Sequence, residues 1–408
     1  MQIPSTLGFA PAVHTAGSDV LKIGLIGCGG RGTGAASQAL NADPNVQLTA
    51  MGDAFSDRLE SSLSALKKDK DVGHKVNVKP ELCFTGFDAY KQVIDSGVDV
   101  VLLCEPPHFR PSHFKYAIEK GKHVFAEKPV AVDAPGVRSV LATCEEAKKK
   151  NLSVVSGLCL RYDVGFQETI KRIHDGAIGD VFSMQANDLR SGIWQKERQP
   201  DWTDMHFQMR NWYHFTWLSG DFNVEQHVHF LDVCAWIMKD EYPVRCNATG
   251  GRQTRTAPGH IYDHFAVVYE YAKGQKLFSF SRQQPRCKND ISCAAAGSKG
   301  NAAIAEGNGK LVLTGDQPWT YRGNHKNMYQ VEHDELFASI RKGKPINNGD
   351  YMSKSSLMAI MARMAAYTGQ QITWQQAMES KEDLSPAKYE WGPLPMPEVA
   401  RPGITKFV

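Results

Sequence analysis

Two stretches of the chain carry side chains that could move a proton. In the first, Glu127-Lys128-Pro129 places a charged pair directly after the apolar run His123 to Ala126. Open α/β sheets bind ligands at the carboxyl ends of their parallel strands, and a following proline favours an extended backbone. A lysine there could donate to a hydroxyl, or remove its proton if burial lowers the lysine pKa. The alternative is a plain Lys-Pro turn.

The second stretch, Phe222 to Met238, predicts one strongly buried helix. Glu225, His229 and Asp232 stand at positions i, i+4 and i+7, so a helix places them on one stripe. A carboxylate one turn from an imidazole can fix its tautomer and raise its pKa. The stripe predicts an acid–base site, and the alternative is a hydrogen-bonded core histidine.

Metal and disulfide chemistry have weaker support. On a helix, His227 and His229 differ by about 200° of azimuth, so both face one ion only if the helix breaks there. The nine cysteines include no C-x-x-C pair, which argues against a zinc ribbon and against a disulfide framework. We therefore predict no metal site.

A glycine-rich turn near the N-terminus could hold a phosphate. Gly27, Gly29 and Gly32 give the spacing G-x-G-x-x-G, with Gly30 and Arg31 inside it, between an apolar run and a helical pattern. Such glycines permit the tight turn, the approach of backbone to a pyrophosphate and close packing of helix on strand. The start of the helix then offers free N–H groups to the phosphates. The turn predicts a dinucleotide site.

Asp53 ends the next apolar run, 21 residues past Gly32. A carboxylate there accepts hydrogen bonds from the adenosine ribose and repels a 2′-phosphate, which favours NAD over NADP. Arg31 could reach a phosphate or pair with the pyrophosphate, so NADP use stays open. The alternative is a chance coincidence of glycines and an acid.

The first part of the chain predicts elements that would hold these residues at a sheet edge. Short apolar runs alternate with helical patterns from Asp19, as in βαβ units. We predict a doubly wound, parallel Rossmann domain at residues 19–157. Its predicted strands are Leu21 to Ile26, Val46 to Met51, Val98 to Leu103, His123 to Ala126 and Ser153 to Ser156. Its predicted helices are Gly34 to Asn41, Ser56 to Lys68, Ala89 to Ser96, Pro111 to Lys120 and Ala134 to Lys150.

After Asp180 the pattern changes to longer alternating strands separated by turns. It predicts an α+β substrate-binding domain at residues 158–385 with a large, mostly antiparallel open sheet. A Pro-rich tail at 386–408 is expected to pack across another domain or subunit. The predicted strands are Pro243 to Gly250, His264 to Tyr271, Lys276 to Arg282, Ile291 to Ala296 and Leu311 to Thr314, and two later helices are Tyr329 to Arg341 and Ser353 to Tyr367.

Bulk properties fit a soluble two-domain protein of 408 residues, 42% hydrophobic and 22% charged. The net charge is +3, and no Lys/Arg block suggests a nucleic-acid arm. No run of about 18 apolar residues could span a membrane. Residues 1–18 predict a flexible segment or the remnant of an export signal. We expect the protein in the cytoplasm or, in the second case, in the periplasm.

In order and spacing, these motifs resemble the Gfo/Idh/MocA family of sugar and polyol oxidoreductases, from about Val20 to the last helix. The resemblance rests on the glycine turn, Glu105-Pro106-Pro107, His113, Glu127-Lys128-Pro129 and Arg161-Tyr162. It implies that Lys128 contacts the nicotinamide ribose and the substrate, and that His229 is the acid/base. Glu225 stands where the family usually has Asp, and His227 is an extra histidine, so the way in which Glu225 and His229 share the acid–base role stays open.

The resemblance also implies two sets of binding residues. The cofactor set is Gly27, Gly29, Gly30, Arg31, Gly32, Asp53, Glu105, Pro106, His113, Glu127, Lys128 and Arg161. The substrate set is Lys128, Tyr162, Trp212, His229 and Asp232, with Lys128, His229 and Glu225 catalytic. Trp212 belongs to the Trp-rich stretch Ser191 to Trp217, where aromatic rings could stack on a sugar or simply pack the loop.

Three functions follow from these observations. The leading one is NAD(P)-dependent transfer of a hydride between nicotinamide and a hydroxyl carbon of a sugar, glycoside or cyclitol. The second is redox-neutral elimination from a glycoside by transient oxidation with tightly bound NAD, and the third is a non-catalytic cofactor-binding protein. The resemblance further implies a homo-oligomer, a dimer or a tetramer, formed through the open sheet face.

Overall fold

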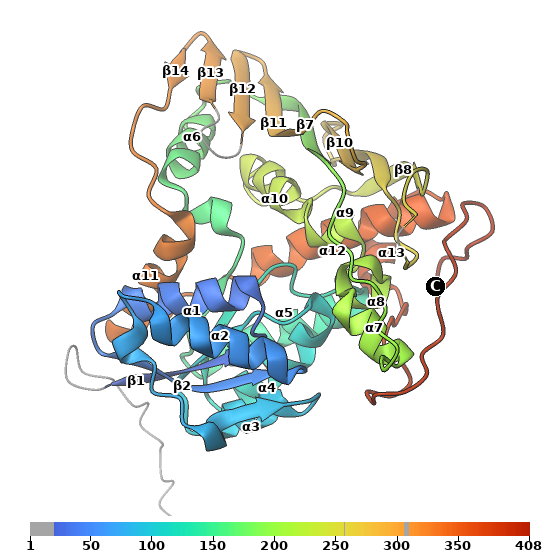
Figure 1. Cartoon of the computed structure of the whole chain (residues 1–408). Coiled ribbons are helices and arrows are strands. Elements are labelled where there is room, and N and C mark those ends of the chain that lie inside the picture. Colours follow the sequence, from blue (N-terminus) through green and yellow to red (C-terminus); the bar gives the residue numbers. More distant parts are fainter. Residues whose placement is uncertain (1–19, 257, 306–309) are drawn as a thin grey trace, which may run out of the picture.

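The computed structural model describes residues 20–256, 258–305 and 310–408, so the segment predicted at 1–18 lies outside the described residues. Two sheets dominate the chain and occupy opposite ends of the molecule (Figure 1). No helix in these ranges combines the length and the apolar surface that a bilayer crossing requires.

The first sheet is parallel and has six strands in the order β3-β2-β1-β4-β5-β6. Its central strands are apolar and almost wholly buried, because helices cover both faces. The predicted doubly wound sheet is confirmed, although the three-residue strand β3 was not predicted. The strands are β1 (Leu21–Ile26), β2 (Val46–Asp53), β3 (Cys83–Thr85), β4 (Val100–Leu103), β5 (His123–Ala126) and β6 (Val154–Ser156).

Five helices alternate with these strands. They are α1 (Gly30–Ala42), α2 (Ser56–Lys68), α3 (Ala89–Asp95), α4 (Arg110–Glu119) and α5 (Ala134–Lys149). α1 begins four residues before its predicted start at Gly34, because Gly30 to Gly32 form its first turn. α5 begins after Asp133, whose carboxylate accepts from Gly136 N at 2.8 Å.

The second sheet has nine strands in the order β14-β13-β12-β11-β7-β10-β9-β8-β15. Only the β7–β10 pair is parallel, so the predicted mostly antiparallel sheet is confirmed. Strands β7 and β12 were not predicted, because small and polar residues in them replace the usual alternation of apolar and polar side chains. The strands are β7 (Val181–Arg190), β8 (Arg245–Gly251), β9 (His264–Glu270), β10 (Lys276–Gln283), β11 (Asp290–Gly297), β12 (Gly300–Ala305), β13 (Leu311–Gly315), β14 (Trp319–Thr320) and β15 (Ile372–Thr373).

Helices cover one face of this sheet and join it to the first (Figure 1). α11 packs on α1 and places Leu336, Phe337 and Ile340 in the core of the first sheet, although we predicted it within the second domain. The helices are α6 (Val164–His174), α7 (Asp204–Arg210), α8 (Thr216–Ser219), α9 (Phe222–Glu225), α10 (Val228–Ile237), α11 (Met328–Arg341), α12 (Gly349–Thr368) and α13 (Trp374–Glu379).

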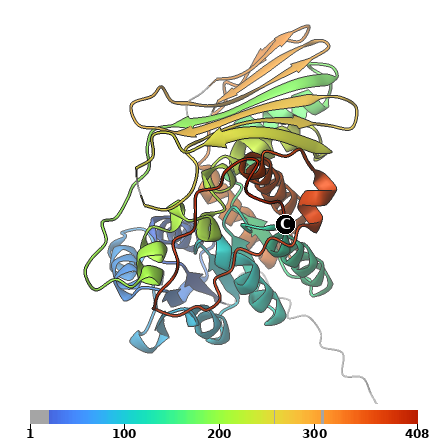
Figure 2. The ribbon, with the colours of Figure 1, turned by 90° about the vertical axis from the view of Figure 1, so that its right-hand side faces the viewer.

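The C-terminal tail, the dark red coil in Figure 2, crosses both parts of the chain. Tyr389 Oη lies 2.7 Å from His108 Nε2, beside the first sheet. Gly392 O accepts from Met205 N of α7 at 3.1 Å. The tail therefore fastens α7 to the rim of the Rossmann unit.

Candidate active site

A cavity of about 780 Å³ lies at the carboxyl ends of β1, β2, β4 and β5, closed on its other side by α7, α9, α10 and the 194–196 loop. Its lining includes most of the predicted site residues. These are Gly27, Gly29, Gly30, Arg31, Asp53, Glu105, Pro106, His113, Glu127, Lys128, Trp212, Glu225 and His229.

The glycine turn has the geometry that a dinucleotide requires. Gly27 has a φ of +91°, and a Cβ there would lie 2.3 Å from Glu105 N. At Gly32 a Cβ would lie 1.9 Å from Gly27 O, so the helix can approach the strand only without a side chain. Gly29 and Gly30 face open space within 4 Å, and no side chain caps α1. The free N–H groups at this helix start fit a pyrophosphate.

Asp53 ties the turn to the end of β2. Its Oδ2 accepts from Cys28 N at 2.6 Å and its Oδ1 accepts from Phe55 N at 2.9 Å. Burial raises the Asp53 pKa, while these N–H groups and the nearby Arg58 and Arg210 oppose the rise. A carboxylate has about four acceptor positions, so it retains capacity for a ribose hydroxyl.

Replacing Asp53 with alanine is expected to weaken NAD binding by about tenfold to a hundredfold, because a charge-assisted hydrogen bond is lost. NADP binding should weaken less, since the repulsion of the 2′-phosphate is lost too. Fluorescence titration with NADH and NADPH measures both affinities. Unchanged affinities for the two nucleotides would rule out Asp53 as the ribose ligand.

Arg31 makes ion pairs and hydrogen bonds within the protein, in addition to lining the cavity where a phosphate contact was predicted. Its guanidinium donates to Glu127 Oε1, to Glu332 Oε1 at 3.1 Å and to Gln38 Oε1 at 2.9 Å. Two carboxylates therefore neutralise it, which the sequence could not show because Glu332 lies on α11, about 300 residues away. Arg31 joins the glycine turn to β5 and α11 without offering a free charge to a phosphate.

Glu105 supports the presence of a hydroxyl-bearing ligand. The residue is 7% exposed and lines the cavity, yet neither carboxylate oxygen has a hydrogen-bond partner. The His113 ring lies beside it, with Nδ1 3.4 Å from Glu105 Oε1, and this ring stacks on Tyr90 at 3.8 Å. A buried carboxylate needs donors, and the hydroxyls of a nicotinamide ribose would supply them.

Lys128 projects from the end of β5 into the catalytic side of the cavity. Its Nζ donates to Glu225 Oε1 at 2.9 Å and to Glu225 O at 2.5 Å. Both side chains are 11% exposed, and Glu225 Oε2 has no partner. The pair thus leaves one buried carboxylate oxygen without a hydrogen-bond partner beside a fixed ammonium.

The helix predicted from Phe222 to Met238 breaks between Glu225 and Val228. The prediction that Glu225, His229 and Asp232 share one stripe of a continuous helix was therefore wrong. At the break His227 turns inward, with Nε2 2.8 Å from Ser279 Oγ on β10. His229, at the start of α10, lines the cavity, and its Nδ1 has no partner. The break therefore directs His227 toward β10 and His229 toward the cavity. In the described part of the chain, no three His, Cys, Asp or Glu side chains group to hold a metal.

The pKa of His229 is shifted in the direction opposite to the predicted one. Burial lowers its pKa well below the ordinary 6.5, and the positive charges of Lys128 and Arg190 act in the same direction. The predicted rise assumed a free carboxylate beside the ring, whereas the Glu225 charge is held by Lys128. His229 is therefore a neutral imidazole near pH 7, able to accept a proton.

Comparison with known proteins fits this geometry. Residues 21–156 match the Gfo/Idh/MocA oxidoreductase family model described as an NAD-binding Rossmann fold, and residues 170–352 match the C-terminal alpha/beta domain of that family. The chain belongs to the Gfo/Idh/MocA oxidoreductase family. It is thus an NAD-binding oxidoreductase, which confirms the predicted family and cofactor.

Three known proteins illustrate the likeness of this Gfo/Idh/MocA chain to others. Inositol 2-dehydrogenase of Pseudomonas fluorescens is 25% identical over 79% of this chain and 87% of its own. Aldose-aldose oxidoreductase from Caulobacter crescentus, solved with glycerol, has a TM-score of 0.68 at 18% identity, over 87% of this chain and 99% of that one. Levoglucosan dehydrogenase with NADH and levoglucosan has a TM-score of 0.67 at 17% identity, with the same coverage.

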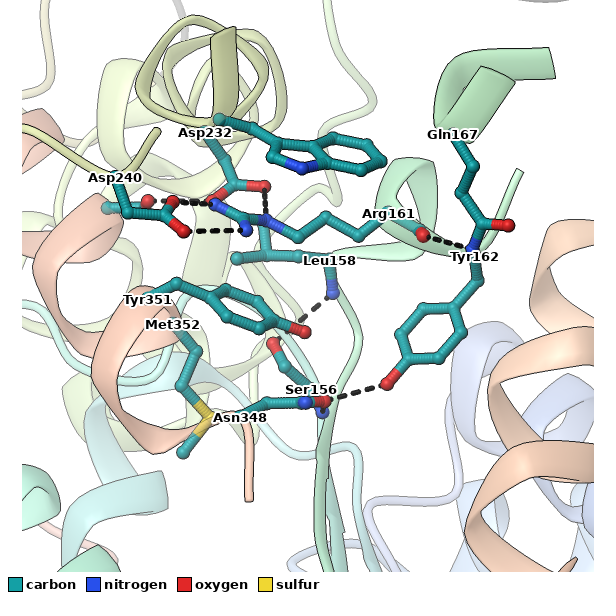
Figure 3. A network of polar contacts seen from close by, with 12 residues as sticks. Ser156, Leu158, Arg161, Tyr162, Gln167, Asp232, Asp240, Asn348, Tyr351 and Met352 are labelled. Atoms are coloured by element: carbon teal, nitrogen blue, oxygen red, sulfur yellow. Dashed lines mark hydrogen bonds and ion pairs between the residues drawn. The ribbon is translucent and has the colours of Figure 1, made fainter. Parts of the chain in front are cut away.

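Three predicted site residues of this oxidoreductase lie in another network, outside the cavity lining. Figure 3 shows Arg161 reaching Asp232 and Asp240, with Tyr351 beside it. The guanidinium lies 3.9 Å from the Tyr351 ring centre, and Tyr162 Oη donates to Asn348 Oδ1 at 2.7 Å. Asp232 follows His229 by three residues, but its carboxylate accepts from Arg161 and from Ser355 Oγ of α12 at 2.7 Å, and it does not line the cavity. Arg161 and Asp232 thus fix α10 on the end of β6 and α12.

Loops add residues to the cavity that sequence reasoning did not select. Trp194, Gln195 and Lys196 line it, and the Trp194 and Trp212 ring centres lie 6.3 Å apart. The high density of tryptophan in this stretch was the available signal. Phe55, Phe87, Arg58, Arg210, Gln226 and Tyr329 also line the cavity, and no sequence spacing identifies them as a group.

Proposed function

We propose that the chain oxidises a ring hydroxyl of a sugar, glycoside or cyclitol and passes the hydride to NAD⁺. The observation that carries this proposal is the meeting of Lys128, Glu225 and His229 beside the dinucleotide turn in one cavity. Glu225 Oε2 and His229 Nδ1 lack partners there. Gln195 and Gln226 add amides to the lining. A ligand with several hydroxyls can satisfy such groups together.

The chemistry divides between these side chains. The Lys128 ammonium, held by Glu225, donates to the oxygen that becomes a carbonyl and stabilises its developing negative charge. Neutral His229 accepts the hydroxyl proton as general base. The bound NAD⁺ would supply the hydride acceptor. The Trp194 and Trp212 rings give a face on which a sugar ring can stack.

The names of relatives agree with this substrate class. An inositol 2-dehydrogenase at 25% identity and the levoglucosan dehydrogenase act on cyclic polyhydroxylated molecules by name. We carry the class, and not a particular substrate, to this chain.

Screening sugars, glycosides and cyclitols for NADH formation with added NAD⁺ tests the proposal. We expect absorbance to rise with at least one class, and the purified protein to bind NADH. Binding of NADH without turnover of any compound would favour a non-catalytic protein instead.

A second candidate is redox-neutral elimination with a retained cofactor, and the tail favours it. The Trp391 ring lies 5.2 Å from Phe55 and 4.6 Å from Phe87, two residues of the cavity lining on the Asp53 side. Arg210 of α7 stacks 3.7 Å over Phe55 and donates to both Asp57 carboxylate oxygens at 2.7 and 2.8 Å. These contacts close the adenosine end, which would slow exchange of the dinucleotide.

The two candidates differ in their need for added cofactor. Incubating the purified protein with an aryl glycoside and no added NAD should release free aglycone if elimination operates. A strict requirement for stoichiometric NAD⁺, with NADH accumulating, supports the dehydrogenase.

We also propose a homo-oligomer formed through the outer face of the second sheet. On β10, Phe278 and Phe280 are 38% and 36% exposed, and they lie opposite Val268 and Ala266 of β9. Such an apolar patch on one open sheet face is a candidate interface. Light scattering at micromolar concentration should give a dimer or tetramer mass, and the double variant Phe278→Glu, Phe280→Glu should give a lower one. A monomeric wild-type chain would contradict this assignment.

A further inference from the structure

The 194–196 loop is held rigidly at the edge of the cavity. His214 Nε2 donates to Trp194 O at 2.8 Å. Asn211 accepts from Lys196 N at 2.9 Å and donates to Lys196 O at 3.1 Å. Both anchoring side chains belong to residues that are fully buried. Asn211 binds both backbone groups of Lys196, so we take the Lys196 side chain as the part of this residue that lines the cavity.

Lys196 differs from most of the other lysines and arginines of the described cavity lining, and the one other residue there without an ion pair or a side-chain hydrogen bond, Arg58, stands near two carboxylates. Arg31 and Lys128 pair with glutamates, Arg210 pairs with Asp57, Arg110 donates to two buried carbonyls, and Arg58 lies in the field of Asp53 and Asp57. Lys196 makes no ion pair or side-chain hydrogen bond with the described residues. It therefore offers the cavity a positive charge that the protein does not neutralise.

Trp194 brings the loop that carries Lys196 to the substrate side of the cavity. Lys196 follows Trp194, whose ring is 6.5 Å from Tyr213. Tyr213 in turn lies within the electrostatic reach of Glu225, the partner of Lys128. The glycine turn and Asp53 belong to the Rossmann unit across the cavity.

We propose that Lys196 is a specificity-determining residue that binds the carboxylate of an acidic sugar, so that the substrate is a hexuronate or its glycoside. This inference rests on the proposed oxidation of a sugar hydroxyl. An ammonium on a flexible stem is a compact point charge, and its hydrogen bond to a carboxylate is stronger than one between neutral groups. One unpaired ammonium matches one carboxylate, whereas a phosphate dianion would keep uncompensated charge. The Trp194 and Trp212 rings would hold the sugar ring nearby.

Methyl β-glucuronide and methyl β-glucoside differ only at C6 and form a matched pair of probes. In the wild type we expect kcat/KM with NAD⁺ to favour the glucuronide by about 10- to 100-fold, the range of a charge-assisted hydrogen bond. Lys196→Gln should reduce the preference to near unity, mainly through a higher KM for the glucuronide. Lys196→Arg should retain most of it, and Lys344→Gln, an exposed lysine away from the cavity, should change nothing.

Binding gives a second readout that does not need turnover. Glucuronide should raise the melting temperature of the NADH-bound wild type more than glucoside or glucoside 6-phosphate does, and Lys196→Gln should remove the difference. Equal shifts for all three probes, a larger shift with the phosphate, or a preference that survives in Lys196→Gln would overturn the inference. Oxidation of glucoside without any preference for glucuronide refutes the role of Lys196 alone. Lys196-dependent glucuronide binding without oxidation of any sugar refutes the proposed reaction alone.

Discussion

Replacing Lys128 with alanine is expected to lower kcat by about 10²- to 10³-fold, the usual cost of removing one donor that stabilises developing negative charge. The ammonium is fixed by Glu225 at 2.9 Å and is 11% exposed, so alanine removes a positioned and largely buried charge. The loss should appear in kcat, because the interaction is made mainly in the transition state. Steady-state kinetics with the substrate found by screening measures it.

NADH affinity is the control for this variant. The glycine turn and Asp53 are untouched, so NADH should bind nearly as tightly as in the wild type, with a small loss if Lys128 also contacts the nicotinamide ribose. Lys344→Ala, in an exposed position outside the cavity, should behave as the wild type in both assays. Full turnover in Lys128→Ala would remove this residue from the reaction.

Replacing His229 with asparagine is expected to reduce turnover by a similar factor and to abolish the acidic limb of the pH profile. In the wild type, burial and the charges of Lys128 and Arg190 lower the imidazole pKa well below 6.5. A lowered pKa means that the ring stays neutral, and remains a base, as the pH falls through 6.5. Oxidation should therefore hold its rate to pH values below 6.5 and decline only when the ring gains a proton.

The electrostatic cause is testable through Lys128. Lys128→Met removes one positive neighbour of His229, so the imidazole pKa should rise toward its ordinary value. The acidic limb of the remaining activity, or the histidine resonance in an NMR titration, should move to higher pH. If His229→Asn keeps full turnover, the acid–base role passes to Lys128 or to a Tyr or His of the Trp-rich loop.

Local spacing was enough to predict that the glycine turn and the end of β2 meet, and both line the cavity. The turn from Gly27 to Gly32 and Asp53 each act within one βαβ unit, where chain order fixes position. Lys128 follows directly from the end of β5 for the same reason. Such predictions require no knowledge of distant contacts.

The sequence did not reveal the partners of side chains that form ion pairs with residues far along the chain. Arg31 is neutralised by Glu127 and by Glu332 of α11, and Arg161 is held by Asp232 and Asp240. Buried charges choose the partners that remove their desolvation cost, and the sequence does not reveal which carboxylate folds beside them.

The helix break has a different cause. The hydrophobic pattern of Phe222 to Met238 is continuous, so it predicts one helix. Tertiary contacts override it: Asp221 accepts from Phe222 N at 2.5 Å and starts α9, and His227 contacts Ser279 of β10. The loop that carries Lys196 escaped prediction because its position depends on the buried Asn211 and His214.

Transfer of deuterium tests the central claim most directly. The best substrate of the screen, carrying deuterium on its ring carbons, is incubated with NAD⁺, and the nicotinamide is analysed by mass spectrometry. We predict that each reduced cofactor gains one deuterium from the oxidised carbon. Formation of product without deuterium in the nicotinamide, even on the enzyme-bound cofactor recovered by denaturation, would contradict hydride transfer in this cavity.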